Sequence, residues 1–276
     1  MRVTVLVEDY SGYESPFLAQ HGISILVEKD NKRILFDTGQ SAEPILHNMK
    51  LLEIDPKSID YVFLSHCHYD HTGGLLGMLK AIGKRVPIIA HPTIFRRHFV
   101  VKPYLREVGV PFRREEIEKL AELYLTSEPI EIVSDIHSTG EIKVRETFEE
   151  DKIGVYTIEG GRIVEDKLLD DMSIVAKTPE GLVVISGCSH AGIVSIVKHA
   201  INLTGEGKVR AVVGGFHLIN ASEERIKRTV EEFQRLGVEE VYTGHCTGLR
   251  AEAEFLRAYG KRFHKIHSGM VIEFRG

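Results

Sequence analysis

The chain has 276 residues, of which 43% are hydrophobic and 27% charged, so it can bury a core and has the composition of a globular protein. Its formal net charge of -5 argues against nucleic acid as an obligate partner, because binding to a polyanion depends on positive charge that releases counterions. No segment approaches the roughly 20 apolar residues of a membrane-spanning helix, and the N-terminus alternates like a strand and does not resemble a signal peptide. We therefore expect a cytoplasmic protein.

Short apolar segments broken by turns predict strands in the first half of the chain. These strands cover residues 2–7, 23–27, 33–36, 59–64 and 86–90, and short helices are predicted over 42–50 and 72–81. The next segment differs in character, because it is rich in Arg, Glu, Phe and Tyr and has a helical pattern at 115–125. We interpret residues 92–129 as a helical insertion packed beside the core.

The second half continues the strand pattern and then alternates strands with helices. Strands are predicted over residues 153–158, 162–164, 173–177, 182–185, 209–213, 240–242 and 271–274, and helices over 193–201, 222–236 and 249–259. Strand-rich halves with helices between them predict a mixed α/β fold, in which two sheets pack face to face and helices flank them. We expect one domain that spans residues 1–276.

Four predicted strands end in polar, glycine-containing or histidine-rich turns. These turns are Ser65-His66-Cys67-His68-Tyr69-Asp70-His71, Gly187-Cys188-Ser189-His190, Gly214-Gly215-Phe216-His217 and Gly244-His245-Cys246. Functional side chains concentrate on loops that a rigid scaffold holds, and strand ends are such places. We therefore predict that these turns meet in one pocket.

The first of these turns carries the most specific pattern. In an extended segment His66 and His68 project to the same side, so both imidazoles can bind one ion. Asp70 and His71 follow where the chain turns into a helix, and they can face a second ion. Imidazole and carboxylate ligands suit zinc, iron or manganese better than calcium or magnesium. The glycine pair at 73–74 lets the backbone pack closely after the turn.

The remaining histidines and the cysteines carry weaker patterns. The three cysteines are too few for a disulfide framework, and each lies within two residues of a histidine, which indicates a reducing compartment and a polar or metal site. His217 is predicted to line the pocket, where it holds substrate or protonates a leaving group. We interpret His21 and His91 as structural residues and His98 as a surface residue.

Two motifs resemble those of a known family. The sequence His-x-His-x-Asp-His after a hydrophobic strand resembles the signature of the metallo-β-lactamase-fold hydrolases, and Asp37-Thr38-Gly39 resembles an earlier motif whose aspartate supports the metal site from behind. The resemblance implies a four-layer αββα sandwich with the site at one sheet edge. The later Gly-Cys-Ser-His-Ala-Gly, Gly-Gly-Phe-His-Leu and His-Cys-Thr-Gly sequences are similar to a branch named for a dihydropterin ribofuranosyl-aminobenzene phosphate synthase.

The resemblance also implies a set of metal ligands. It assigns one site to His66, His68 and His190, and the other to Asp70, His71 and His245. The ligand that bridges the two ions stays open between Asp171, Cys188 and a hydroxide alone. We favour Asp171, because a carboxylate bridges two cations well.

Two cations in this arrangement would lower the pKa of a bound water toward neutrality and polarise a phosphoryl oxygen. We therefore predict a metal-dependent hydrolase with two Zn²⁺ ions, or with Mn²⁺ or Fe²⁺ in their place, and with Asp70 and His217 as catalytic residues. Its predicted substrate is an anionic small molecule, either a phosphodiester or another phosphorylated compound. Four arginines of the insertion are candidates for holding the anionic group: Arg96, Arg97, Arg113 and Arg114.

Three alternatives stay open. A synthase of the pterin branch would join a pterin-type alcohol to an arylamine phosphate, with the metal as a Lewis acid. A di-iron redox protein is the second alternative, and a non-enzymatic metal or ligand sensor is the third. A homodimer is also left open.

Overall fold

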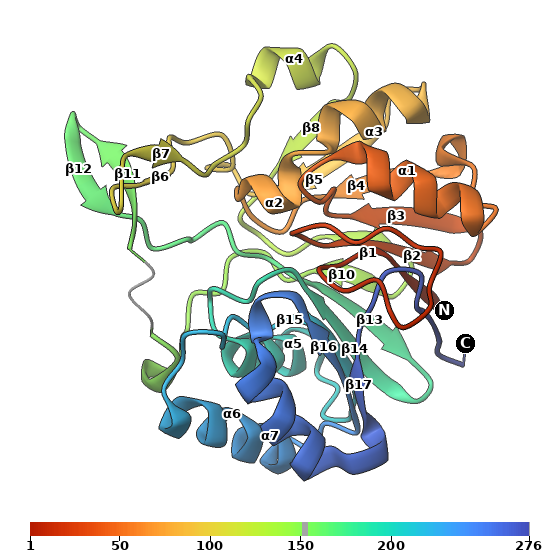
Figure 1. The fold of residues 1–276 in the computed structure, drawn as a ribbon, viewed down its shortest axis with the longest axis vertical. Helices are drawn as coiled ribbons and strands as arrows, with labels where there is room; N and C mark the ends of the chain where they lie inside the picture. The colour runs from red at the N-terminus through yellow and green to blue at the C-terminus, as the bar shows by residue number, and fades with distance from the viewer. Residues whose placement is uncertain (151–153, 276) are drawn as a thin grey trace.

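The computed structural model describes residues 1–150 and 154–275, and within them the chain forms two seven-stranded sheets that lie face to face (Figure 1). The first sheet has the order β18-β1-β2-β3-β4-β5-β8. Its strands are β1 (Arg2–Val7), β2 (Ser24–Lys29), β3 (Lys32–Phe36), β4 (Tyr61–Phe63), β5 (Pro87–Ala90), β8 (Glu122–Leu125) and β18 (Val271–Glu273).

The second sheet has the order β17-β16-β15-β14-β13-β10-β9. Its strands are β9 (Glu131–Val133), β10 (Ile136–Ser138), β13 (Ile174–Thr178), β14 (Gly181–Ser186), β15 (Val209–Gly215), β16 (Glu240–Gly244) and β17 (Phe263–Lys265). In each sheet the strands next to the site run parallel, as β3 pairs with β4 and as β14, β15 and β16 pair in turn. The carboxyl ends of these strands therefore reach the same edge of the molecule.

Helices cover the outer face of each sheet (Figure 1). The first sheet carries α1 (Ala42–Leu51), α2 (Tyr69–Thr72) and α3 (Leu75–Ile82), and the second carries α5 (Ile193–Thr204), α6 (Glu223–Arg235) and α7 (Leu249–Tyr259). Short 3-10 turns occur at Pro56–Ser58, Thr147–Glu149, His245–Thr247 and Gly260–Arg262. Within the described residues, none of the helices combines the length and apolarity needed to cross a lipid bilayer.

The alternating side chains of β14 show why the fold has four layers. Successive side chains of a strand point to opposite faces of its sheet. Leu182 and Val184 accordingly pack into the core under the helices, whereas Val183 and Ile185 pack into the core between the sheets. A third core lies between the first sheet and its helices. Both sheets are thus apolar on both faces, and the predicted αββα sandwich is confirmed.

The segment predicted as a helical insertion consists mostly of turns and loops, with three short strands. Residues 92–129 contain one short helix, α4 (Arg114–Glu118), and the predicted helix over 115–125 is wrong beyond Glu118. The chain instead forms β8, which pairs parallel with β5 and is itself the edge strand of the first sheet. Backbone groups of β5 gain hydrogen bonds from β8, and this outweighs the local helical pattern.

A small four-stranded sheet stands away from the sandwich beside this segment (Figure 1). It has the order β12-β11-β6-β7, with β6 (Phe99–Val100), β7 (Arg106–Glu107), β11 (Val155–Glu159) and β12 (Arg162–Glu165). We call this sheet the arm. The two strands predicted over residues 153–158 and 162–164 are thus a hairpin of the arm and not core strands. Residue 153 itself lies outside the described residues.

Candidate metal centre

The first cluster of potential ligands contains His66, His68 and His190. The Nε2 atom of His66 lies 3.0 Å from Nδ1 of His68, and Nε2 of His190 lies 3.2 Å from the same Nδ1 atom. His66 is buried, whereas His68 and His190 are partly accessible. These three residues are the set that the sequence assigned to one ion, and they converge on a point that solvent can reach.

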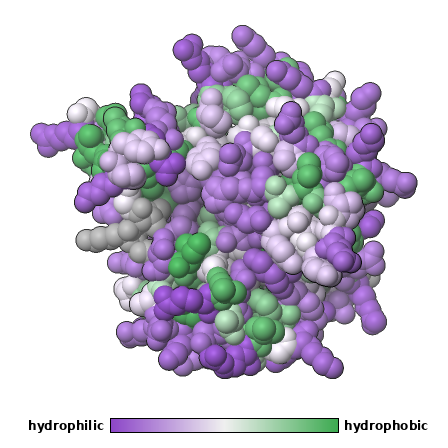
Figure 2. Space-filling model, in the orientation of Figure 1, coloured by the Kyte–Doolittle hydropathy of each residue, from purple (hydrophilic) through white to green (hydrophobic). Residues whose placement is uncertain are grey.

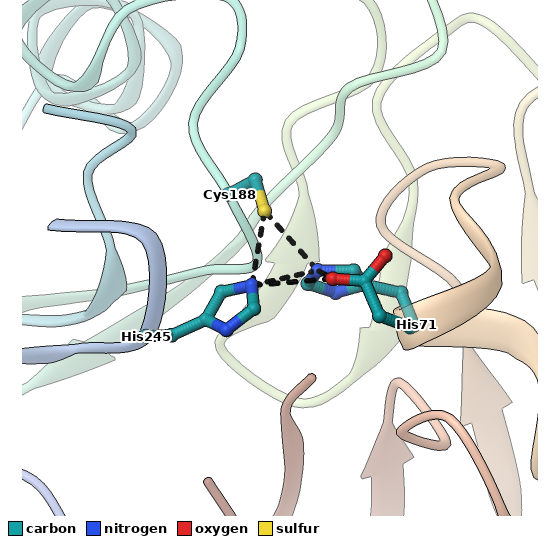
Figure 3. Close-up of side chains that lie close together, drawn as sticks. His71, Cys188 and His245 are labelled. Atoms are coloured by element: carbon teal, nitrogen blue, oxygen red, sulfur yellow. Dashed lines mark hydrogen bonds and ion pairs between the residues drawn. The ribbon is translucent and has the colours of Figure 1, made fainter. Parts of the chain in front are cut away.

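The second cluster contains Asp70, His71, Cys188 and His245. The sulfur of Cys188 points toward both imidazoles, 3.1 Å from Nε2 of His71 and 3.3 Å from Nε2 of His245 (Figure 3). A carboxylate oxygen of Asp70 lies 3.4 Å from each of these two nitrogens. The rings of His66 and His71 have centroids 4.2 Å apart, so the two clusters adjoin.

Asp37 supports both clusters from the end of β3. Its Oδ1 accepts a hydrogen bond from the backbone N–H of Ser65, and its Oδ2 accepts from the Ser65 hydroxyl and from Nδ1 of His71. The Ser65 oxygen in turn lies 2.8 Å from Nδ1 of His66 and can accept from it. With protons on both Nδ1 atoms, the Nε2 lone pairs of His66 and His71 face the clusters.

His245 is held in the same manner by Asp9. Its Nδ1 donates to Oδ2 of Asp9 at 2.6 Å, which leaves Nε2 for the second cluster. The other oxygen of Asp9 accepts from Nδ1 of His21 at 2.9 Å, and Nε2 of His21 lies 3.5 Å from the carboxylate of Asp70. Asp9 and His21 were not predicted as site residues. Their only sequence signal is that each follows or precedes a strand, which is too common to identify them.

The two clusters have opposite electrostatic character. Burial lowers the pKa of His68 to about 3 and also lowers the pKa values of His66 and His190 well below the usual histidine range. Burial acts in the same direction on His71, but the carboxylates of Asp70 and Asp37 outweigh it and raise the pKa of His71 to about 9. The first cluster is therefore neutral without a metal, and the second binds protons.

The geometry fits a tetrahedral cation. With metal–nitrogen distances of about 2.0–2.1 Å, neighbouring ligand nitrogens in a tetrahedral site lie about 3.3 Å apart. The facing nitrogens of the two clusters are separated by 3.0–3.3 Å. A thiol among the donors suits zinc or iron better than magnesium or calcium. The donor set therefore fits transition-metal ions.

Asp171, the residue we favoured as the bridging ligand, is not among the residues of either cluster, and its Oδ1 has no partner among the described residues, so its bridging role stays a prediction. Its carboxylate is buried, and Oδ2 accepts from the backbone N–H of Ala191 at 2.8 Å. This contact holds the side chain beneath the loop that carries His190. The residue that reaches the second cluster from the end of β14 is Cys188.

His217 lies beside the first cluster, as predicted. It forms a further group of potential ligands with Cys188 and His190, and its ring centroid is 4.3 Å from that of His190. Its buried Nδ1 atom has no hydrogen-bond partner among the described residues. An imidazole with a free nitrogen next to the centre can take up or deliver a proton.

The predicted surface and anion-holding residues differ from expectation. His98 is fully buried, and its Nε2 atom lies 2.8 Å from Nε2 of His68. It follows two arginines and precedes a short apolar pair, a mixed context that does not indicate burial beside a metal centre. Three of the four arginines proposed to hold an anion pair with carboxylates instead: Arg96 with Asp166 and Asp170, Arg97 with Glu107, and Arg114 with Glu118.

A family model for the metallo-beta-lactamase superfamily matches residues 21–245, which include every residue of the two clusters. The chain belongs to the metallo-beta-lactamase superfamily. Both the αββα sandwich and the position of the ligand clusters agree with this assignment.

Two relatives of this superfamily member come from Methanocaldococcus jannaschii. One is named 7,8-dihydropterin-6-methyl-4-(beta-D-ribofuranosyl)-aminobenzene-5'-phosphate synthase and is 47% identical, covering 99% of this chain and 97% of that protein. The other is an uncharacterized protein, 34% identical over 90% of this chain and 91% of its own length. A crystal structure described as a metal-dependent hydrolase of the beta-lactamase superfamily matches with a TM-score of 0.85 and 31% identity, and covers 100% of both chains.

These comparisons correct the predicted activity. The leading prediction from sequence was hydrolysis of a phosphodiester or phosphorylated small molecule. The relative that is 47% identical over almost the full length is named a synthase, which was the stated alternative. The expected membership of the synthase branch is confirmed, and the prediction of a hydrolase as the main activity is wrong.

Proposed function

We propose that this chain is a metal-dependent synthase that forms 7,8-dihydropterin-6-methyl-4-(β-D-ribofuranosyl)-aminobenzene-5'-phosphate, the compound in the name of its relative. The observation that carries this proposal is the 47% identity to that synthase over 99% of the chain. The two adjoining ligand clusters support it, because they offer a place to activate a poor leaving group.

The name of the product defines the bond to be made. A dihydropterin with a 6-methyl carbon is joined to the nitrogen of an aminobenzene that carries ribofuranose 5'-phosphate. The amine nitrogen attacks a methylene carbon that bears an oxygen leaving group, as in a 6-hydroxymethyl-dihydropterin or its diphosphate ester. The C–N bond forms, the C–O bond breaks, its electron pair leaves with the oxygen, and the amine loses one proton.

In this proposal His66, His68 and His190 hold one ion, and Asp70, His71, Cys188 and His245 hold the other. Bound Zn²⁺, or Fe²⁺ or Mn²⁺ in its place, supplies Lewis acidity toward the departing oxygen. His217 accepts the amine proton, since its ring lies beside that of His190 and its Nδ1 has no partner among the described residues. Asp37 and Asp9 hold His71 and His245 in the orientation that the reaction needs.

The substrates in this proposal are small molecules, of which the arylamine phosphate is anionic, and nucleic acid has no role. We also propose a cytoplasmic location. The three cysteines are free, and two of them, Cys188 and Cys246, are in or beside the centre, where oxidation would remove a donor.

The test is a synthesis assay with protein reconstituted with Zn²⁺, Fe²⁺ or Mn²⁺. The 4-(β-D-ribofuranosyl)-aminobenzene 5'-phosphate is mixed with 6-hydroxymethyl-7,8-dihydropterin, as free alcohol or diphosphate, and the joined product is measured by mass spectrometry. We expect product with at least one metal, its loss on chelation, and a decrease of about 100-fold or more in His217→Ala.

Bis-(p-nitrophenyl) phosphate serves as a parallel substrate. Turnover of this phosphodiester without any joined product would refute the proposed synthase. A His217→Ala protein that keeps full activity and full metal content would refute the assigned role of His217 alone.

A further inference from the structure

The imidazole of His68 is contacted at both of its nitrogens. Nδ1 faces the first cluster, where it lies 3.0 Å from His66 and 3.2 Å from His190. Nε2 points the other way and lies 2.8 Å from Nε2 of His98. One of these two Nε2 atoms must carry a proton and the other must accept it, because two lone pairs at this distance would repel each other.

Asp166 decides which nitrogen carries the proton. Its Oδ2 lies 2.8 Å from Nδ1 of His98, and a carboxylate can only accept, so His98 is protonated at Nδ1. A neutral His98 then has its lone pair on Nε2, which accepts the proton of His68 Nε2. His68 is left with its lone pair on Nδ1, the nitrogen that faces the cluster. With an ion in the first cluster, which needs the lone pair of His68 Nδ1, this assignment satisfies every contact in the chain of three residues.

Buried charges hold this chain of hydrogen bonds in place. Arg96 contacts both oxygens of Asp166, through Nε at 2.5 Å and Nη2 at 2.9 Å. The same Nη2 atom lies 2.8 Å from Oδ1 of Asp170. The other oxygen of Asp170 accepts from the backbone N–H of Cys67, between the two histidines of the first turn. The metal-binding turn is therefore held at its backbone and at one ring by the same ionic network.

This support comes from a part of the chain that supplies no ligand to either cluster. Ser65 and Asp37, which orient His66 and His71, lie at the ends of β4 and β3 in the sandwich. His98 directly precedes β6 and Asp166 directly follows β12, so both stand at the base of the arm. Neither is solvent-exposed, with side-chain accessibilities of 0% and 5%.

We propose that Asp166 and His98 are positioning residues that fix the tautomer and the ring orientation of His68, so that the base of the arm sets the metal affinity of the first cluster. Outer hydrogen-bond partners of metal-binding histidines typically change metal affinity by about 10–100-fold. The effect is expected at one ion only, because neither residue contacts a member of the second cluster in the described part of the chain.

The test measures zinc binding to the full chain by competition with a chromophoric chelator, with total metal by elemental analysis. His98→Phe keeps a ring but has no acceptor, and we expect it to bind one of two ions about 10–100-fold more weakly. His98→Gln restores an acceptor oxygen and should recover most of that loss. His264→Phe is the control, because His264 in β17 stacks on Tyr242 in β16 and belongs to neither cluster. This variant should bind zinc as the unaltered chain does.

A second readout reports the tautomer directly. In zinc-loaded protein labelled with ¹⁵N-histidine, the proton on Nε2 of His68 should show scalar coupling across the hydrogen bond to Nε2 of His98, and His98→Phe should abolish that coupling. Wild-type affinity for both ions in His98→Phe would overturn the proposal. So would an equal loss at both ions together with a lower unfolding temperature of the metal-free variant, or a His98→Gln protein no better than His98→Phe. Metal binding is measured without turnover, so these outcomes are independent of the proposed synthase.

Discussion

At the scale of single residues, the histidines of the two clusters differ in protonation. Those of the first cluster favour the neutral form, whereas His71 and His245 of the second favour the protonated form. Desolvation and the neighbouring histidines lower the pKa values of His66, His68 and His190, which keeps them unprotonated. Desolvation also acts to lower the pKa values of His71 and His245, but the carboxylates of Asp70 and Asp37 raise that of His71, and Cys246 together with Asp70 and Asp9 raises that of His245. The same residue type thus offers a ready lone pair in one cluster and a proton to be displaced in the other.

We therefore predict that the two ions respond differently to pH. A raised pKa of about 9 means that His71 is protonated below that pH in metal-free protein, so a cation must displace its proton. Affinity at the second cluster should fall by about tenfold per pH unit between pH 8 and pH 6 for each proton displaced. Affinity at the first cluster should stay nearly constant, because the pKa of His68 is lowered to about 3.

Chelator competition at a series of pH values measures this difference. Two ions that lose affinity in parallel as the pH falls would contradict it. Asp37→Asn removes one of the charges that raise the pKa of His71. It should therefore reduce the pH dependence of metal affinity at the second cluster.

At the scale of elements, the periodic strands and helices lie close to where the sequence predicts them. The predicted helices over 42–50 and 193–201 correspond to α1 and α5, and the strand over 182–185 corresponds to β14. The helix over 115–125 fails at the point where β8 meets β5, because pairing with a neighbouring strand cannot be read from a local pattern. The ends of a helix or strand depend on nearby residues, whereas the strand it pairs with depends on residues far away in the sequence.

The turn between the first metal motif and α3 depends on close backbone contact. A Cβ atom on Gly73 would lie 2.2 Å from the carbonyl oxygen of Gln40, and one on Gly74 would lie 2.1 Å from that of Thr38. These oxygens belong to the loop after β3 that also carries Asp37. Glycine at 73 and 74 thus lets the two metal-supporting loops touch.

We predict that Gly73→Ala lowers the free energy of unfolding by about 1–3 kcal/mol, because backbone atoms must shift to admit the methyl group. Urea unfolding of the metal-free protein measures this change. The matched control is Gly207→Ala, where an added Cβ meets no atom within 4 Å and the effect should be small. Equal unfolding midpoints for the two variants would contradict the prediction.

At the scale of the whole molecule, the centre joins the two sheets. His66, His68, Asp70 and His71 follow β4 of the first sheet, whereas Cys188, His190 and His245 follow β14 and β16 of the second. A cation in either cluster would therefore bridge the halves of the sandwich. That residues 1–276 form a single domain stays a prediction, and such a bridge is consistent with it.

We predict that metal removal lowers the unfolding temperature. At a free metal concentration 100 times Kd, one ion that binds only the folded state contributes about 2.7 kcal/mol, which corresponds to roughly 5–10 °C for a chain of this size. Thermal unfolding monitored by circular dichroism, with and without chelator, measures the shift. A double variant, His68→Ala with His71→Ala, should show no such shift. An unchanged unfolding temperature after confirmed metal loss would contradict the bridging role.

The layered α/β fold and the metal-binding pattern of the first turn can be predicted from the sequence, because strand period and the spacing of His66, His68, Asp70 and His71 are local properties of the backbone. The residues that approach this turn from other strands are known only from the tertiary fold. Cys188 meets His71 across 117 residues of chain, and Asp166 meets His98 across 68. The repeat of side chains along a strand or helix cannot indicate contacts between positions so far apart in the sequence. Packing of the two sheets and the arm brings them together, so the approach of Cys188 to the second cluster and the burial of His98 emerge only once the strands are paired.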